Sequence, residues 1–259
     1  MKRLFIFLMS LSAALAASAQ TYPYQDASLT PEERAKDLLG RLSVEQKVML
    51  MDYDSPEIPE FGIRKYNWWN EALHGSARNG LATVFPQAVG MAASWNDELL
   101  EEVFDVASTE QRIKFSIARD EEGVRRYHGL TVWTPNINIF RDPRWGRGHE
   151  TYGEDPYLTA ALGIEYVKGM QGQGEFLKTA ACAKHYAVHS GPEARRHEFD
   201  ARVCEKDLYE TYLFAFEELV KKANVMSVMG AYNRVNSQPA CASEKLMKKL
   251  WKTEKPNKN

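Results

Sequence analysis

Several features are scarce in this sequence of 259 residues, and each absence narrows the range of functions. Positive charge is not in excess, because 33 Lys and Arg residues face 35 Asp and Glu residues, so we expect no nucleic-acid partner. No glycine-rich phosphate loop follows a predicted strand, which argues against a dinucleotide-binding fold. Beyond residue 19 no apolar run is long enough to cross a bilayer, so we expect no membrane partner for the mature chain.

Cysteine is also scarce, with only Cys182, Cys204 and Cys241 in the chain. An odd number leaves at least one thiol unpaired, and at most one disulfide of undetermined pairing can form. The spacing of the cysteines does not resemble a zinc site, and His185 and His189 have no third ligand at a suitable spacing. We therefore expect no metal and no cofactor, and we interpret the cysteines as small buried residues.

The first nineteen residues have the pattern of a secretory signal peptide. A basic start at Lys2 and Arg3 precedes an apolar stretch over residues 4–17, and Ala17-Ser18-Ala19 supplies a small-x-small cleavage site. The apolar run is shorter than the roughly 20 residues that a membrane anchor needs. This pattern predicts export of the mature chain to the periplasm or the extracellular medium.

Predicted helices and strands alternate along the rest of the chain. Thr30 and Ser43 each begin a capping pattern, and Gly40 is the expected stop of the first helix. Apolar spacing and capping residues predict helices at 31–40, from 44, at 97–118, 156–172 and 206–222 and from 244, and strands at 130–133, 178–183 and 225–229. Repeated strand–helix units are typical of a parallel α/β fold, and a single barrel fits the chain length.

Polar clusters follow apolar segments at four places, where a barrel would carry its chemistry. The clusters are residues 68–75 (WWNEALHG), 141–150 (RDPRWGRGHE), 184–186 (KHY) and 232–236 (YNRVN). The tryptophans beside Glu71 form either a sugar-binding platform or an ordinary core pair. The arginines either bind hydroxyl groups or pair with Asp142 or Glu150. Lys184 and His185 can both reach a ligand only where the strand ends, because adjacent strand residues alternate faces.

Together, these four clusters resemble glycoside hydrolase family 3 in its β-xylosidase and β-glucosidase branch. They occur in the order found in that family, and the likeness extends from about residue 29 to about residue 249. The resemblance implies an α/β fold with a TIM-like (β/α)8 barrel that is incomplete at its C-terminal end. The implied domains are the signal peptide at 1–19, a partial barrel at 20–250 and a divergent polar tail at 251–259.

The resemblance also implies an exo-acting retaining β-glycosidase that removes terminal sugars from β-linked oligosaccharides. One carboxylate would attack the anomeric carbon and a second carboxyl group would protonate the leaving oxygen. By similarity, the terminal sugar would contact five residues and two weaker members, namely Glu71, Arg147, Lys184, His185 and Tyr232, then Arg144 and Arg196. Glu71 and the tryptophan pair resemble the xylosidase members, which favours xylo-oligosaccharides over glucosides and leaves arabinofuranosides open.

Both catalytic carboxyl groups of the family are missing from this sequence. The family's nucleophile lies in a Ser-Asp motif on the strand after the final helix, where residues 251–259 are polar and contain no Ser-Asp. The family's acid/base residue comes from a second domain. We therefore expect residues 1–259 alone to be inactive, and an open barrel edge to favour aggregation.

Two other interpretations remain open from the sequence. The chain could be an exported sugar-binding fragment without catalysis, in which the predicted sugar contacts are retained. It could also be an unrelated exported structural or interaction protein, whose motifs are only loop punctuation. Titration with xylose or glucose distinguishes the first of these from a chain that binds no sugar.

Overall fold

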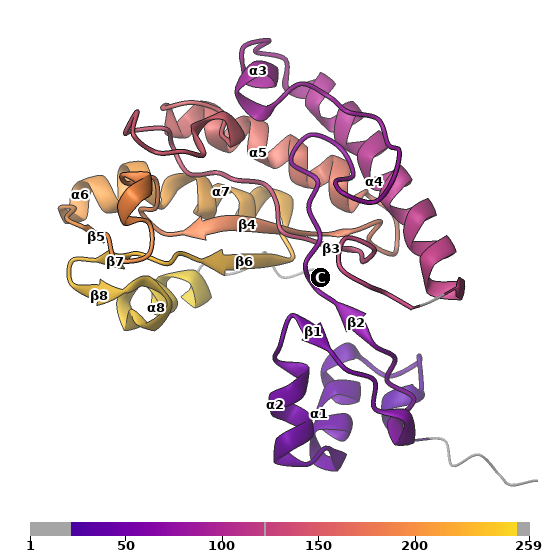
Figure 1. The fold of residues 1–259 in the computed structure, drawn as a ribbon. Helices are drawn as coiled ribbons and strands as arrows, with labels where there is room; N and C mark the ends of the chain where they lie inside the picture. The colour runs from indigo at the N-terminus through magenta and orange to yellow at the C-terminus, as the bar shows by residue number, and fades with distance from the viewer. Residues whose placement is uncertain (1–21, 122, 253–259) are drawn as a thin grey trace, which may run out of the picture. The chain divides into compact units, whose positions relative to one another are not determined.

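The computed structural model describes residues 22–121 and 123–252 (Figure 1). The expected signal peptide and all but the first two residues of the expected tail lie outside the described residues. The chain divides into two compact units, residues 1–48 and residues 49–259, which are described separately. No helix in the described part of the chain is both long and apolar enough to span a membrane.

The first unit contains a 3-10 turn and a capped helix. Thr30 and Glu33 form the predicted capping box, with the Glu33 carboxylate accepting from the Thr30 backbone N–H at 2.9 Å. The prediction that Gly40 ends this helix is wrong, because Gly40 stays helical and Leu42 is the extended C-cap. The elements are η1 (Pro23–Gln25), α1 (Pro31–Arg41) and the start of α2 (Val44–Leu50).

A parallel sheet forms the centre of the second unit. Its strands are β3 (Thr131–Val132), β4 (Ala180–Tyr186) and β6 (Ser227–Gly230), in the order β3-β4-β6. Residues 134–138 continue alongside β4 after β3 ends, through backbone bonds such as Ile137 N–H to the Lys184 carbonyl at 2.9 Å. The carboxyl end of β4 therefore has neighbours on both sides.

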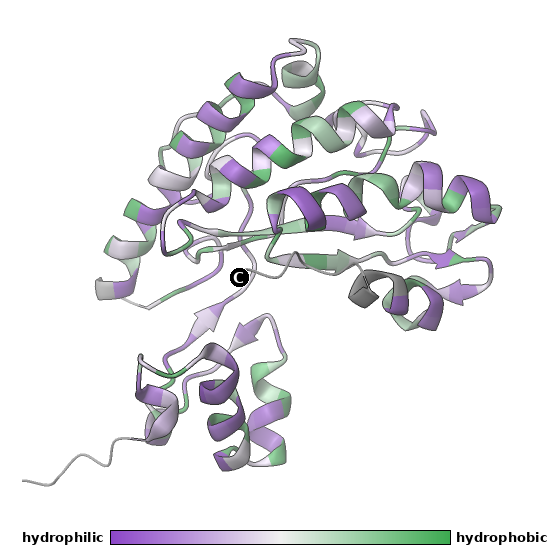
Figure 2. Ribbon diagram, turned by 180° about the vertical axis from the view of Figure 1, so that it is seen from behind, coloured by the Kyte–Doolittle hydropathy of each residue, from purple (hydrophilic) through white to green (hydrophobic). Residues whose placement is uncertain are grey.

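Three long helices pack in the order α4–α5–α7, and α5 and α7 also contact β4 (Figure 1). They are α4 (Asp97–Glu121), α5 (Pro156–Gln171) and α7 (Phe214–Ala223). Hydrophobic and hydrophilic residues alternate along α4, whereas α5 is largely apolar, as expected for a helix covered on most sides (Figure 2). The largest fully buried apolar side chains include Leu100, Phe104, Ile137, Leu162, Tyr166, Met170, Tyr186, Leu213, Phe216, Leu219 and Leu246.

Shorter elements connect the strands and helices. β1 pairs antiparallel with β2, and β7 pairs with β5 in parallel and with β8 antiparallel. The bounds are β1 (Asp54–Ser55), η2 (Pro59–Phe61), β2 (Tyr66–Asn67), α3 (Ala88–Ala92), η3 (Gly148–Glu150), η4 (Glu193–Arg195), β5 (Asp200–Ala201), α6 (Glu205–Asp207), the π-helical turn η5 (Leu208–Tyr212), β7 (Arg234–Val235), β8 (Gln238–Pro239), η6 (Ala240–Ala242) and α8 (Glu244–Lys252).

The structure confirms an α/β fold and corrects several boundaries. β4 continues to Tyr186 instead of ending at residue 183, and a π-helical turn divides the predicted helix 206–222. α8 extends to Lys252, so the first two residues of the expected tail are helical. The parallel sheet of the described residues has three strands and is open, so a closed barrel is not confirmed.

The cysteine prediction is correct at one position. Cys182 is buried, as expected, whereas Cys204 and Cys241 are exposed, and all three thiols are free. Cys204 lies at the N-cap of α6 and its sulfur accepts from the Asp207 backbone N–H, which explains why it remains near the surface.

Gly169 allows α4 and α5 to approach closely. A Cβ at this position would lie 2.4 Å from the Glu101 carbonyl oxygen and 2.9 Å from the Asp105 nitrogen, both in the α4 backbone. We predict that Gly169→Ala lowers the free energy of unfolding by about 1–3 kcal/mol, because the helices must separate. Gly90→Ala in α3 is the matched control, since its Cβ would meet only an ordinary contact at 3.7 Å. Equal urea midpoints for the two variants would contradict this packing.

Candidate active site

The carboxyl end of β4 carries the two central side chains of the site, Lys184 and His185. Both residues lie within β4, so the prediction that they come after the end of the strand is wrong. That prediction assumed that both side chains reach a ligand only where the regular alternation of a strand stops. The alternation is interrupted within β4 itself, because the pairing of β4 with β6 shifts register between Lys184 and Tyr186. A register irregularity of this kind redirects neighbouring side chains and releases backbone groups from the ladder.

Side chains from the segment after β3 occupy the backbone groups released at His185. The Asn138 carboxamide oxygen accepts from the His185 backbone N–H at 2.8 Å and lies 3.0 Å from Nδ1 of its ring. The Asn138 Nδ2 donates to the His185 carbonyl at 2.9 Å. On the far side of the ring, Nε2 lies 3.0 Å from Nη1 of Arg147. Both ring nitrogens of His185 are thus engaged by protein groups.

Arg147 is held by a carboxylate as well as by His185. Its Nε and Nη2 donate to the Glu150 carboxylate at 2.9 and 2.6 Å, and Asn136 donates to the same carboxylate at 3.4 Å. Burial by itself raises the pKa of Glu150, but the hydrogen bond and charge of Arg147 outweigh it and hold the pKa below its ordinary value. The expected pairing of an arginine in this loop with Glu150 is confirmed.

Lys184 is a buried cation whose pKa is lowered. Its side chain belongs to a residue only 4% exposed, and burial lowers its pKa to about 8. Burial is the largest cause of this lowering, to which the positive charge of Arg147 contributes, whereas the carboxylates of Glu150 and Glu71 oppose it. No hydrogen bond joins its ammonium group to another side chain among residues 22–121 and 123–252, so its donors are available to a ligand.

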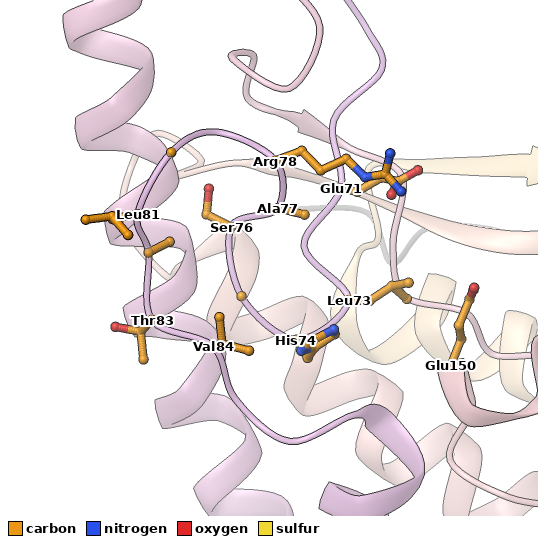
Figure 3. Close-up of a pocket in the computed structure, with 13 residues that line it drawn as sticks. Glu71, Leu73, His74, Ser76, Ala77, Arg78, Leu81, Thr83, Val84 and Glu150 are labelled. Carbon is orange, nitrogen blue, oxygen red and sulfur yellow. The ribbon is translucent and has the colours of Figure 1, made fainter.

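A pocket of about 430 Å³ meets this cluster at Glu150, whereas Lys184 and His185 are not among its lining residues (Figure 3). The loop of residues 73–84 encloses one side of the pocket, and Glu71 and Glu150 lie on the other. The Glu71 carboxylate accepts from the Trp69 indole N–H at 3.1 Å, which orients it. The volume is within the range of small-molecule sites, and two carboxylates with a buried ammonium nearby are suited to a polyhydroxylated ligand.

The structure places Arg144 and Arg196 near a different pocket. Arg144 forms a two-pronged ion pair with Asp142 at 3.0 and 2.8 Å, and the Arg144 hydrogen bonds hold the pKa of Asp142 to about 2. Arg196 pairs with Glu193 at 2.8 Å. Asp142, Arg144 and Glu193 line a pocket of about 530 Å³. The expected pairing of an arginine with Asp142 is therefore also confirmed.

The aromatic candidates lie at exposed or half-buried positions. Tyr232 is 62% exposed and its ring lies 4.7 Å from that of His197. Trp69 contacts Trp133 at a centroid distance of 5.2 Å, with the Arg126 guanidinium 4.2 Å from its ring. Trp69 is therefore half-buried and covered by other side chains, so it is neither part of a fully buried core pair nor an open sugar-binding platform.

Two asparagines and a second histidine complete the site and were not predicted from the sequence. Asn136 and Asn138 are buried, and their alternation with Ile137 and Ile139 is the signal that could have placed them on one face of an extended segment. His189 lies 4.4 Å from His185 between ring centroids, and burial lowers the pKa of His189 to about 4. In the described part of the chain, no group of three or more His, Cys, Asp or Glu side chains is placed to hold a metal ion.

The chain belongs to glycosyl hydrolase family 3, because the model of that family's N-terminal domain matches residues 46–255. A relative named xylan 1,4-beta-xylosidase, from Xylanibacter ruminicola, is 52% identical over 259 residues, which is 98% of this chain and 30% of the relative. A beta-xylosidase/alpha-L-arabinofuranosidase from Medicago sativa subsp. varia is 41% identical and covers 89% of this chain. The chain thus spans about a third of the length of these relatives.

Solved structures of glycosidases have a similar fold. An exo-beta-xylosidase in complex with a xylobiose aziridine activity-based probe matches 89% of this chain and 31% of its own, with a TM-score of 0.80 and 35% identity. A beta-glucosidase from Kluyveromyces marxianus matches 82% of this chain and 24% of its own, with a TM-score of 0.68 and 30% identity.

The burial of Lys184 predicts a stability cost with a defined pH dependence. Because its folded pKa of about 8 is below the ordinary 10.5, the unfolded chain binds more protons between these values, so stability rises as the pH rises through them. We expect Lys184→Met to raise the free energy of unfolding at pH 7 by about 1–3 kcal/mol and to flatten this rise.

Urea denaturation of both proteins at pH 7 and at pH 10 measures the effect. Lys206→Met is the matched control, because the Lys206 side chain is 75% exposed and its ion pair with Glu210 is long, at 3.9 Å. A Lys184→Met variant that is less stable than the parent at pH 7 would show that the ammonium group is stabilising where it lies.

Proposed function

We propose that this chain is the sugar-binding domain of an exo-acting, retaining β-xylosidase. The observation that carries this proposal is the buried Lys184, placed among Arg147, Glu150 and Glu71 beside the pocket. The family and the names of the relatives support the same activity. The three parallel strands and their helices would form part of a TIM-like barrel, with the site at the carboxyl end of the strands.

The geometry suits a terminal sugar because it offers both kinds of hydrogen-bonding partner. The carboxylates of Glu71 and Glu150 accept from hydroxyl groups, and the Lys184 ammonium donates to them. Hydrogen bonds with a charged partner are about twice as strong as neutral ones, and exclusion of water strengthens them further. A sugar would also bring new donors and acceptors close to Lys184, which offsets part of the cost of its burial.

A terminal xylose is our first choice of substrate, with glucose second. The relatives from Xylanibacter and Medicago and the structure with the xylobiose probe all carry xylosidase names. The similarity to a beta-glucosidase supports the second choice. We further propose that the chain is exported, since residues 1–19 have the signal-peptide pattern.

In a retaining mechanism, two carboxyl groups about 5–5.5 Å apart act as nucleophile and acid/base. The residues of this chain would hold the terminal ring, and neither of these two carboxyl groups is assigned to it. We therefore predict no turnover of an aryl β-xyloside by residues 1–259 alone. Release of the aryl group well above the rate given by heat-denatured protein would refute this prediction.

Isothermal titration with xylose tests the proposed sugar site directly. We expect the chain to bind xylose more tightly than glucose and Lys184→Met to abolish the heat of binding, because the only buried ammonium in the cluster is removed. Lys206→Met serves again as the control and should bind like the parent. No heat with either sugar, from protein whose circular dichroism shows it to be folded, would overturn the proposal.

A sugar-binding protein without catalysis is the second candidate function. The same cluster favours it, because all the contacts described above lie within this chain. Xylose binding together with no turnover by residues 1–259 would agree with this candidate and with the first. Turnover by a longer chain that contains this domain would decide for the β-xylosidase.

A further inference from the structure

We propose that Asn138 is a positioning residue that fixes the tautomer of His185 and, through it, the direction of the Arg147 guanidinium. The relevance to sugar binding rests on the proposed function, whereas the tautomer itself does not. Asn138 lies on the segment that continues β3, and its side chain bonds both the backbone and the ring of His185.

The hydrogen bonds of Asn138 define which atom faces the ring. Its Nδ2 donates to the His185 carbonyl at 2.9 Å, so the amide is oriented with Oδ1 toward the histidine. Oδ1 accepts from the His185 backbone N–H at 2.8 Å and lies 3.0 Å from Nδ1. Because a carbonyl oxygen can only accept, the proton of the ring must be on Nδ1.

The contact on the opposite edge of the ring agrees with this assignment. Nη1 of Arg147 lies 3.0 Å from Nε2 of His185, and a guanidinium group can only donate. Nε2 must therefore be unprotonated and accept this hydrogen bond. Burial holds the pKa of His185 well below its ordinary value, so the ring is neutral and can have this single arrangement.

This arrangement determines where Arg147 points. Two of its nitrogens are bound to Glu150 and the third to His185, so the guanidinium plane is fixed from two directions. A His185 ring with its proton on Nε2 would place an N–H against an Arg147 N–H. The guanidinium would then turn away, and the Glu150 carboxylate that borders the pocket would turn with it. His185 therefore acts on a sugar through Arg147.

Nitrogen NMR of protein labelled with ¹⁵N-histidine tests the assignment. In the wild-type chain at pH 7, we expect His185 to show a protonated Nδ1 and an unprotonated Nε2, the reverse of the tautomer that free imidazole side chains favour. His185→Gln identifies the signals by their loss. Asn138→Ala should shift the ring toward the Nε2–H tautomer and weaken xylose binding by about tenfold.

Asn236→Ala is the matched control for the tautomer. The Asn236 side chain makes the same pair of backbone contacts as Asn138 but with another residue, because its Oδ1 accepts from the Val203 N–H at 3.0 Å and its Nδ2 donates to the Val203 carbonyl at 2.8 Å. We expect its variant to leave the His185 signals unchanged. A merely structural role of Asn138 would lower stability without moving the tautomer.

Two results would overturn the proposal. One is a wild-type spectrum with the proton on Nε2, which needs no variant to fold. The other is a folded Asn138→Ala variant with the wild-type tautomer. If the wild-type chain binds no xylose but its ring carries the proton on Nδ1, the proposed sugar site fails and the positioning role of Asn138 stands.

Discussion

Parallel pairing between the segment after β3 and the end of β4 is the constraint on which the site depends. This pairing places Asn136 and Asn138 beside Lys184 and His185, although almost fifty residues of chain separate them. The register shift on the β6 side then frees His185 from the ladder at the same point. The other edge of β4 also shifts by one residue, from the pair Val132–Ala181 to the pair Asn136–Lys184, so the strand is irregular on both edges where the chemistry lies.

Burial of charge is compensated differently at each residue of the cluster. Arg147 and Glu150 satisfy one another by direct hydrogen bonds, which makes their burial tolerable. Lys184 has charges of both signs nearby and no direct partner among the described residues, so its cost is left in the folded state. A buried cation without a direct side-chain partner is prepared for a polar ligand and makes the protein less stable when that ligand is absent.

The elements that the sequence predicts well are those with local signals. Thr30 and Glu33 define the start of α1 through contacts three residues apart, and this capping pattern is confirmed. The four polar clusters also follow from the sequence, because they stand next to apolar segments. The register shift at His185, the amide of Asn138 and the division of the helix after Cys204 depend on distant neighbours, so no local pattern reveals them.

β6 is an edge strand of the described sheet, with β4 on one side only. Its free edge presents a row of backbone donors and acceptors, and the preceding Met226 is 56% exposed. β4 and β6 are joined by a long helical crossover, so we expect their pairing, and with it this edge, to form late in folding. During synthesis the exposed edge of β6 is therefore free to pair with the same edge of another molecule. The rate at which another strand covers this edge sets the protein concentration at which aggregation begins.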